Sequence, residues 1–260
     1  MKITVCRLPD GRDAFADDWG RLVEHVKVQG SAVVLLPEMP FFTWFPSARR
    51  FNANTWDAAV SAHDRWQSRL AELAPAVALM TRPVDYGDAR YSAGFWWNEK
   101  ERILESMHAK SRLWNEKGTW ETTWYEAAFP AFEPAIVKGI GIGMLIGPEI
   151  WIPDQAKLYA EDDVHVIAVP RADYSPDVDV NATDNAWLAA GRDTALASGA
   201  YCVSSTRVTK KDSTGGAGWI IDPDGRVLAI TSANEPIVTA DVAIALDVAD
   251  TRDAAPWNRA

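Results

Sequence analysis

Hydrophobic residues along this chain follow two spacings that alternate from one segment to the next. Continuous apolar runs bounded by glycine or proline, such as residues 32–36, are typical of strands that are buried on both faces. Other segments, such as residues 19–26, place apolar residues three or four positions apart, which predicts an amphipathic helix. The alternation of these two patterns favours an α/β fold over separate helical and strand domains.

The predicted elements cover most of the chain. Strands are expected at residues 3–6, 32–36, 76–80, 91–98, 102–107, 139–146, 164–169, 200–205, 217–221 and 227–231. Helices are expected around residues 19–26, 56–73, 154–159 and 185–198. The fourth and fifth strands are predicted to pair as a hairpin. No repeat, low-complexity tract or linker interrupts the series, so residues 1–260 are predicted to form one domain.

The composition narrows the class of protein. The chain has 260 residues, of which 48% are hydrophobic and 24% are charged, as in soluble globular proteins. No apolar run reaches the roughly 18 residues that a membrane span needs, and the first residues lack the apolar core of a signal peptide. A cytoplasmic protein without a membrane partner is therefore expected. The 26 basic and 36 acidic residues give a formal net charge of −10, which disfavours nucleic acid as a partner.

The residue types that bind metals are scattered along the chain. Cys6 and Cys202 lie far apart and show no metal-type spacing, so both are interpreted as small buried residues on strands. The four histidines also form no ligand cluster: His25, His63, His108 and His165. Neither a catalytic metal nor another cofactor is expected.

Two charged residues follow predicted strands. Glu38 comes after a buried strand, where burial raises the pKa of a carboxyl group towards the range that suits a general base. The alternative interpretation is a glutamate that only anchors the loop. Lys110 follows the strand at residues 102–107 and could stabilise an oxyanion, although a single lysine at a strand end is usually solvated.

A third segment, residues 139–151, runs from a strand through a sharp turn at Gly147 and Pro148 into a helix. This is the topology that presents a nucleophile at the turn. Gly141 and Gly143 lie inside the strand and not in the loop after it, which argues against a dinucleotide-binding loop.

In this order, the three segments resemble the nitrilase superfamily of carbon–nitrogen hydrolases, and the resemblance covers essentially the whole chain. It continues through four later segments: residues 166–172, the helix with Trp187 and Arg192, residues 201–205, and the Gly215–Gly216 pair before residues 219–225. The resemblance implies an α/β fold that is a four-layer α–β–β–α sandwich, with two central sheets packed face to face. It also implies a homodimer or a higher homo-oligomer that buries the helix after Gly147 and the helix around Trp187.

The resemblance also implies roles for individual residues. Glu38 matches the general base, Lys110 the lysine that stabilises the tetrahedral intermediate, and Glu121 the second glutamate, which positions the substrate and orders the lysine. Glu149 matches the acidic residue two places after the nucleophile. The nucleophilic cysteine of the family falls at Gly147, and Cys202 does not replace it, because Cys202 lies on a later strand.

Without a thiol at position 147, this chain cannot form the thioester of the family's mechanism. Three explanations remain open. The chain has diverged naturally and uses acid–base and electrostatic catalysis alone; it is an inactivated form of a Cys-dependent amidase or nitrilase; or it is a non-catalytic ligand-binding protein on the same fold. Pro148 favours divergence, because a proline restricts the backbone of the residue before it and so changes the turn as well.

The expected substrate is a small molecule. Phe42, Trp120 and Trp151 flank the three motifs and are predicted, with Glu149, to bind the substrate, although tryptophans in such positions also serve as ordinary core. Aromatic walls favour a small, partly apolar or planar substrate. Amides, nitriles and carbamoyl amines remain equally open.

Overall fold

The fold is described from a computed structural model, which describes residues 1–10, 12–100, 102–172, 180–208 and 216–244. Gly215, which belongs to the resemblance, lies outside these ranges. The strands of the large sheet are β1 Lys2–Pro9, β2 Val33–Leu35, β3 Val77–Tyr86, β4 Ala89–Asn98, β5 Ile103–Ala109, β8 Ala135–Val137, β9 Ile140–Met144, β10 Val166–Pro170, β11 Tyr201–Val208, β12 Trp219–Ile221, β13 Val227–Ile230 and β14 Ile237–Asp241. A separate small ribbon consists of β6 Asn115–Glu116 and β7 Thr119–Trp120.

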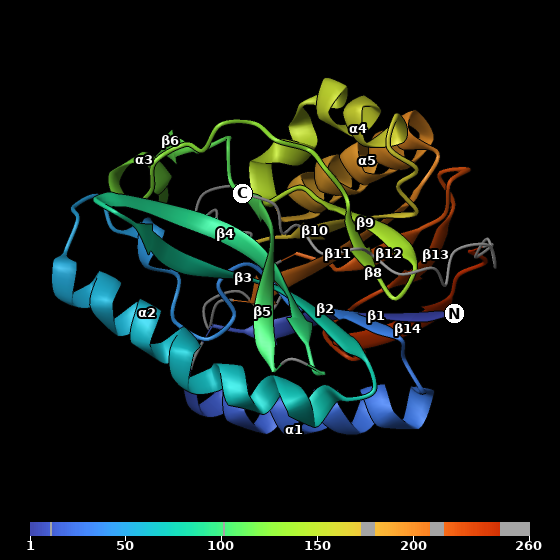
Figure 1. The fold of residues 1–260 in the computed structure, drawn as a ribbon, viewed down its shortest axis with the longest axis horizontal. Helices are drawn as coiled ribbons and strands as arrows, with labels where there is room; N and C mark the ends of the chain where they lie inside the picture. The colour runs from blue at the N-terminus through green and yellow to red at the C-terminus, as the bar shows by residue number, and fades with distance from the viewer. Residues whose placement is uncertain (11, 101, 173–179, 209–215, 245–260) are drawn as a thin grey trace, which may run out of the picture.

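The helices lie on the outside (Figure 1). The α-helices are α1 Arg12–Gln29, α2 Ala53–Gln67, α3 Glu121–Trp124, α4 Pro153–Ala160 and α5 Val180–Ser198. The 3₁₀ helices are η1 Phe45–Ser47, η2 Ser68–Leu73 and η3 Gly147–Trp151. In the described part of the chain, no helix combines the length and the apolar character that a membrane crossing requires.

Strand β1 joins two halves of one continuous sheet. The strand order is β5-β4-β3-β2-β1-β11-β10-β9-β8, with β14 on β1 and β12 and β13 beyond β11. The first part of β1 pairs in parallel with β2, from Ile3 opposite Val33, and its last three residues pair in parallel with β11, from Arg7 opposite Thr206. Because β1 passes from one half to the other, the two halves fold over each other.

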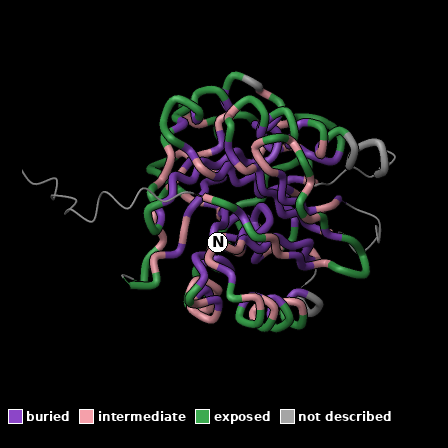
Figure 2. Tube along the Cα trace, turned by 90° about the vertical axis from the view of Figure 1, so that its right-hand side faces the viewer, coloured by how far each residue is buried: buried purple, intermediate pink, exposed green. Residues whose placement is uncertain are grey.

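Three apolar clusters define the layers. One of them lies between the two half-sheets and contains Val5 and Leu79 from one half and Ile142 and Val203 from the other. A second cluster fills the space beneath α1, and a third lies beneath α4 and α5. Figure 2 shows the same order, with buried segments in the middle and exposed ones on the outer helices. These layers confirm the predicted α–β–β–α sandwich.

The observed elements differ from the expected ones mainly in length. The helix expected at residues 56–73 is α2 followed by η2, because the backbone tightens into a 3₁₀ helix at Ser68. The strands β8 and β14 and the short helix α3 were not predicted. β14 is held by pairing with β1 along all five of its residues, from Ile237 to Asp241, and this long-range pairing leaves little trace in a local pattern.

A glycine allows a close contact between the two half-sheets. A Cβ atom at Gly94 on β4 would overlap the sulfur of Met144 on β9. The change Gly94→Ala is therefore expected to lower the free energy of unfolding by about 1–3 kcal/mol, as overpacking of a core does. Chemical denaturation would measure this loss.

The matched control is Gly20→Ala on the exposed face of α1, where no described atom lies within 4 Å of the added Cβ. This change is expected to stabilise the protein by about 0.4–1 kcal/mol, because alanine restricts the unfolded chain. Equal effects of the two changes would contradict the close packing at Gly94.

Candidate active site

The loop that carries Glu38 is tied to both half-sheets. The Glu38 backbone N–H donates to the Arg171 carbonyl at 3.1 Å, and the Met39 N–H donates to the hydroxyl of Thr81 at 2.8 Å. The Arg207 guanidinium donates to the carbonyl of Glu38 at 3.0 Å and to that of Met39. These bonds fix the loop just after β2, so the Glu38 side chain enters the interior in one orientation.

Lys110 links the two predicted glutamates. Its backbone N–H donates to the carbonyl of Ser92 on β4 at 2.8 Å, which extends the pairing beyond β5. Its Nζ atom donates to Oε1 of Glu38 at 2.8 Å and to Oε1 of Glu121 at 2.6 Å. All three side chains are at least 98% buried, so the structure brings together the three residues that the resemblance assigned to catalysis.

The two glutamates differ in how their oxygens are engaged. Oε2 of Glu121, the first residue of α3, accepts from the Trp114 N–H at 2.9 Å, so both of its oxygens have protein partners. Oε1 of Glu38 accepts from Lys110 and from the Ser92 hydroxyl at 3.2 Å. Within the described residues, no hydrogen bond reaches Oε2 of Glu38. That oxygen is therefore the one available to a ligand.

Gly147 faces this free oxygen. A Cβ atom built on Gly147 would lie 3.1 Å from Oε2 of Glu38 and 3.2 Å from Nζ of Lys110. Gly147 has a φ of +54°, in the left-handed region that disfavours side chains, and it begins η3. The carboxylate, the ammonium group and the turn thus meet at the position of the first side-chain atom of residue 147.

Burial and charge set the protonation of the centre. Burial raises the pKa of Glu38, Lys110 lowers it and Glu121 raises it, with a net value of about 7. For Lys110, burial lowers the pKa, but the two neighbouring carboxylates outweigh burial and the net shift is upward. At neutral pH the centre therefore combines a charged amine with a carboxyl group that readily exchanges a proton.

Glu149 lies behind the turn. Its Oε2 accepts from the Ile146 N–H at 2.6 Å and from Nε2 of His108 at 2.8 Å. Its Oε1 accepts from both the N–H and the hydroxyl of Ser111, at 2.7 and 2.6 Å. Burial raises its pKa, but His108 and Ser111 outweigh burial and lower it overall. A charged carboxylate bonded in this way holds the turn to the end of β5.

The three aromatic residues predicted to bind the substrate lie on separate segments. Trp120 immediately precedes Glu121, and the Arg49 guanidinium lies 5.0 Å from the centre of its ring. Trp151 is 41% exposed at the end of η3, with its ring centre 4.9 Å from that of Trp187.

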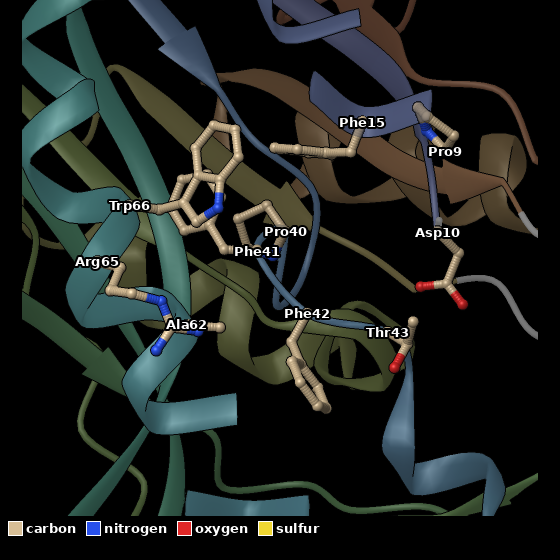
Figure 3. A pocket seen from close by; sticks show the side chains of 10 residues that line it. All are labelled: Pro9, Asp10, Phe15, Pro40, Phe41, Phe42, Thr43, Ala62, Arg65 and Trp66. Atoms are coloured by element: carbon tan, nitrogen blue, oxygen red, sulfur yellow. The ribbon is translucent and has the colours of Figure 1, made fainter. Parts of the chain in front are cut away.

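Phe42 lines a cavity of about 230 Å³ together with Phe41, Arg65, Trp66 and the side chain of Asp10 (Figure 3). The Phe41 and Trp66 rings are stacked there at 5.2 Å. Glu38, Lys110, Glu121 and Gly147 are not among the residues that line this cavity.

Sequence patterns missed several residues of the site. Ser92, His108 and Arg207 reach it from strands through tertiary contacts, so their spacing gives no local signal. Tyr125 did carry a signal: it lies four residues after Glu121, which is the spacing of one helical turn. Its N–H donates to the Glu121 carbonyl at 2.8 Å, and its side chain is buried.

Known proteins resemble this chain in sequence and in fold. The sequence profile of the carbon-nitrogen hydrolase family matches residues 2–252. No curated protein gives a significant match. The chain is similar in structure to a carbon-nitrogen hydrolase from Helicobacter pylori G27, with 19% identity and a TM-score of 0.79 over 92% of this chain and 88% of the other.

Two further structures are also similar. An amidase from Nesterenkonia sp. has 17% identity and a TM-score of 0.70 over 93% of this chain and 90% of its own. A double mutant of the amidase from Nesterenkonia sp. AN1 in complex with acrylamide has 16% identity and a TM-score of 0.70, over 94% and 90% of the two chains. At such identities, these similarities establish the fold.

The raised pKa of Glu38 predicts how the stability depends on pH. The folded state favours the neutral carboxyl group, so its contribution to stability is present below about pH 4.5 and is lost as the pH rises through about 7. Glu38→Gln keeps a neutral group of the same shape. At pH 8 we expect this variant to be more stable than the parent by roughly 1–3 kcal/mol, and at pH 4.5 about equally stable.

Urea denaturation at the two pH values would measure this difference. Glu24→Gln, at an exposed position of α1, serves as the control. A difference between parent and Glu38→Gln that did not change with pH would contradict the assigned protonation.

Proposed function

Because the chain belongs to the carbon–nitrogen hydrolase family, we propose that it hydrolyses a small amide, nitrile or related C–N substrate without a covalent intermediate on the enzyme. Glu38 is the general base, Lys110 stabilises the developing oxyanion, and Glu121 holds the lysine. One observation carries the proposal: Oε2 of Glu38 and Nζ of Lys110 lie 3.1 and 3.2 Å from the position of the first side-chain atom at Gly147.

The position of Gly147 corresponds to that of the family's nucleophile. In a mutant of the amidase from Nesterenkonia sp. AN1, acrylamide has undergone Michael addition at the active-site cysteine. In our chain a base and an ammonium group converge on a residue without a side chain, so the attacking atom has to come from elsewhere. Water meets this requirement, since both groups lie within hydrogen-bond reach of the same point.

For an amide, the proposed reaction has two steps. Glu38 takes a proton from water, the hydroxide oxygen bonds to the carbonyl carbon, and the carbonyl electrons move to the oxygen, which accepts a hydrogen bond from Lys110. The tetrahedral intermediate then collapses: the C–N bond breaks, and Glu38 returns its proton to the leaving nitrogen. The products are a carboxylic acid and ammonia or an amine, and Glu38 is regenerated.

The other residues support this arrangement. Glu149 is assigned to holding the turn, because its oxygens are bonded to Ile146, His108 and Ser111. Trp120 borders the centre through its neighbour Glu121. Phe42 and Trp151 lie further out and are proposed to contact only the outer part of a substrate.

The first prediction of this mechanism concerns the base. Glu38→Gln is expected to lower kcat/KM by about 10²–10⁴-fold, because it removes a general base while keeping its shape. Activity of the parent should rise through about pH 7, as Glu38 loses its proton. It should also survive iodoacetamide, because burial raises the pKa values of both Cys6 and Cys202 to about 12. Ammonia release from a panel of amides and nitriles would measure all three effects.

Gly147→Cys distinguishes this mechanism from the alternatives. If hydrolysis appears only in that variant and is blocked by iodoacetamide, the chain is an inactivated Cys-dependent enzyme and the proposal is wrong. If neither form is active, the chain is a ligand-binding protein. Parent activity that persisted in Glu38→Gln would exclude Glu38 as the base.

The proposed assembly is a homodimer, or a higher homo-oligomer, that buries α4 and α5. Leu158 on α4 and Leu196 on α5 are 46% and 59% exposed, although both are large and apolar. The pair of changes Leu158→Asp and Leu196→Asp is expected to produce a monomer in sedimentation experiments. Val28→Asp on α1, where Val28 is also exposed, is the matched control. A monomeric parent at micromolar concentration would contradict the proposal.

A further inference from the structure

Tyr125 is held in place by its ring, not by its hydroxyl group. The ring centre lies 5.8 Å from that of Phe45 and 5.9 Å from that of Trp56, both at steep angles. The residue is only 3% exposed and belongs to an apolar cluster that also contains Met39, the neighbour of Glu38. Phenylalanine would satisfy all of these contacts.

The hydroxyl group of Tyr125 has no hydrogen-bond partner among the described residues. Tyr159, another buried tyrosine, shows the usual arrangement: its hydroxyl donates to the carbonyl of Met144 at 2.9 Å and accepts from the Met144 N–H at 3.0 Å. An unpaired buried hydroxyl lowers stability, and tyrosine normally finds a partner when it is buried. Among the described residues, the Tyr125 hydroxyl is therefore a buried donor that is left for a bound ligand.

The surroundings of this hydroxyl make it a donor. Burial raises the pKa of Tyr125 well above its usual value, and the charges of Glu38 and Glu121 raise it further. The hydroxyl is therefore protonated at neutral pH and can donate a hydrogen bond to an oxygen or nitrogen acceptor. Tyr125 lies beside the Glu38–Lys110 centre, because its backbone N–H is bonded to the Glu121 carbonyl and its ring shares an apolar cluster with Met39.

The same surroundings select against an anionic ligand. Lys110 is already shared by two carboxylates. Arg207 is bonded to Asp10, and Arg171 lies between the rings of Trp187 and Trp219 at 4.8 and 4.5 Å. An added carboxylate would meet Glu38 and Glu121 with no cation left over among these buried groups, which is a costly arrangement.

We infer that Tyr125 is a substrate-binding residue whose hydroxyl donates a hydrogen bond to an uncharged amide held beside Glu38 and Lys110. This inference rests on the proposed function and adds the substrate class and one contact. The aromatic neighbours of Tyr125 enclose the apolar part of the substrate, and the hydroxyl fixes its polar end.

Binding to a non-reacting form tests this inference separately from catalysis. Titration calorimetry compares Glu38→Gln with Glu38→Gln/Tyr125→Phe, using propionamide and its charged counterpart succinamate as probes. We expect propionamide to bind the first form saturably and the second about tenfold more weakly, the usual effect of one lost hydrogen bond. Succinamate is expected to bind at least tenfold more weakly than propionamide.

Tyr159→Phe in the same background is the matched control. It breaks a bond within the protein, so it should lower the Tm and leave the Kd of propionamide within twofold. Tyr125→Phe should leave the Tm of the ligand-free protein unchanged or raise it.

Three results would each overturn the inference: equal affinities with and without the Tyr125 hydroxyl, no saturable binding of propionamide, or a Tm loss in Tyr125→Phe as large as that in Tyr159→Phe. Succinamate binding as tight as that of propionamide would overturn the uncharged class. Absence of hydrolysis by the parent, with these binding results intact, would refute only the proposed function.

Discussion

The buried ammonium group of Lys110 is the constraint on which the rest of the site depends. Burying an unpaired charge of this kind lowers the free energy of unfolding by several kcal/mol. Lys110 can therefore be buried only when carboxylates lie next to it. Those carboxylates come from different parts of the fold: Glu38 from the loop after β2 and Glu121 from the start of α3. The three segments therefore have to assemble together. The same pairing uses one oxygen of Glu38 and leaves the other facing Gly147.

The backbone turn at Gly147 is held by several buried hydrogen bonds, although Gly147 has no side chain to orient. Glu149 accepts bonds from Ile146, His108 and Ser111, all buried or partly buried, and these bonds hold the backbone of the turn against the end of β5. In a hydrolase with a nucleophile at this position, such support would aim a side chain. Here the turn faces a carboxylate and an ammonium group, which lie 3.1 and 3.2 Å from the position of a Cβ atom on Gly147. The proposed mechanism depends on such precise positioning of charged groups.

Much of the fold was readable from the sequence, because buried parallel strands appear as continuous apolar runs and Glu38 ends one of them. The order of the motifs was sufficient to place Glu38, Lys110 and Glu121 in one group, and the structure brings them together. The sequence did not predict the contacts that residues in the middle of strands make. Ser92 on β4 reaches Glu38 only because the neighbouring strands are in register, and His108 reaches Glu149 across 41 positions of the chain. β14 was missed for the same reason, since its partner β1 lies at the other end of the chain.

Two features of the centre lower the stability of the ligand-free protein, and the same kind of ligand removes both. An ionised Glu38 is less favourable in the folded state than a neutral one, and the buried hydroxyl of Tyr125 has no hydrogen-bond partner among the residues that the structure describes. A scaffold with only structural demands would be more stable with glutamine at 38 and phenylalanine at 125, at no loss of packing. An uncharged amide with its attacking water satisfies both groups at once, because the water donates to Glu38 and the amide accepts from Tyr125. Active sites typically contain strained or unpaired groups that lower the stability of the ligand-free protein. A bound substrate removes this loss of stability.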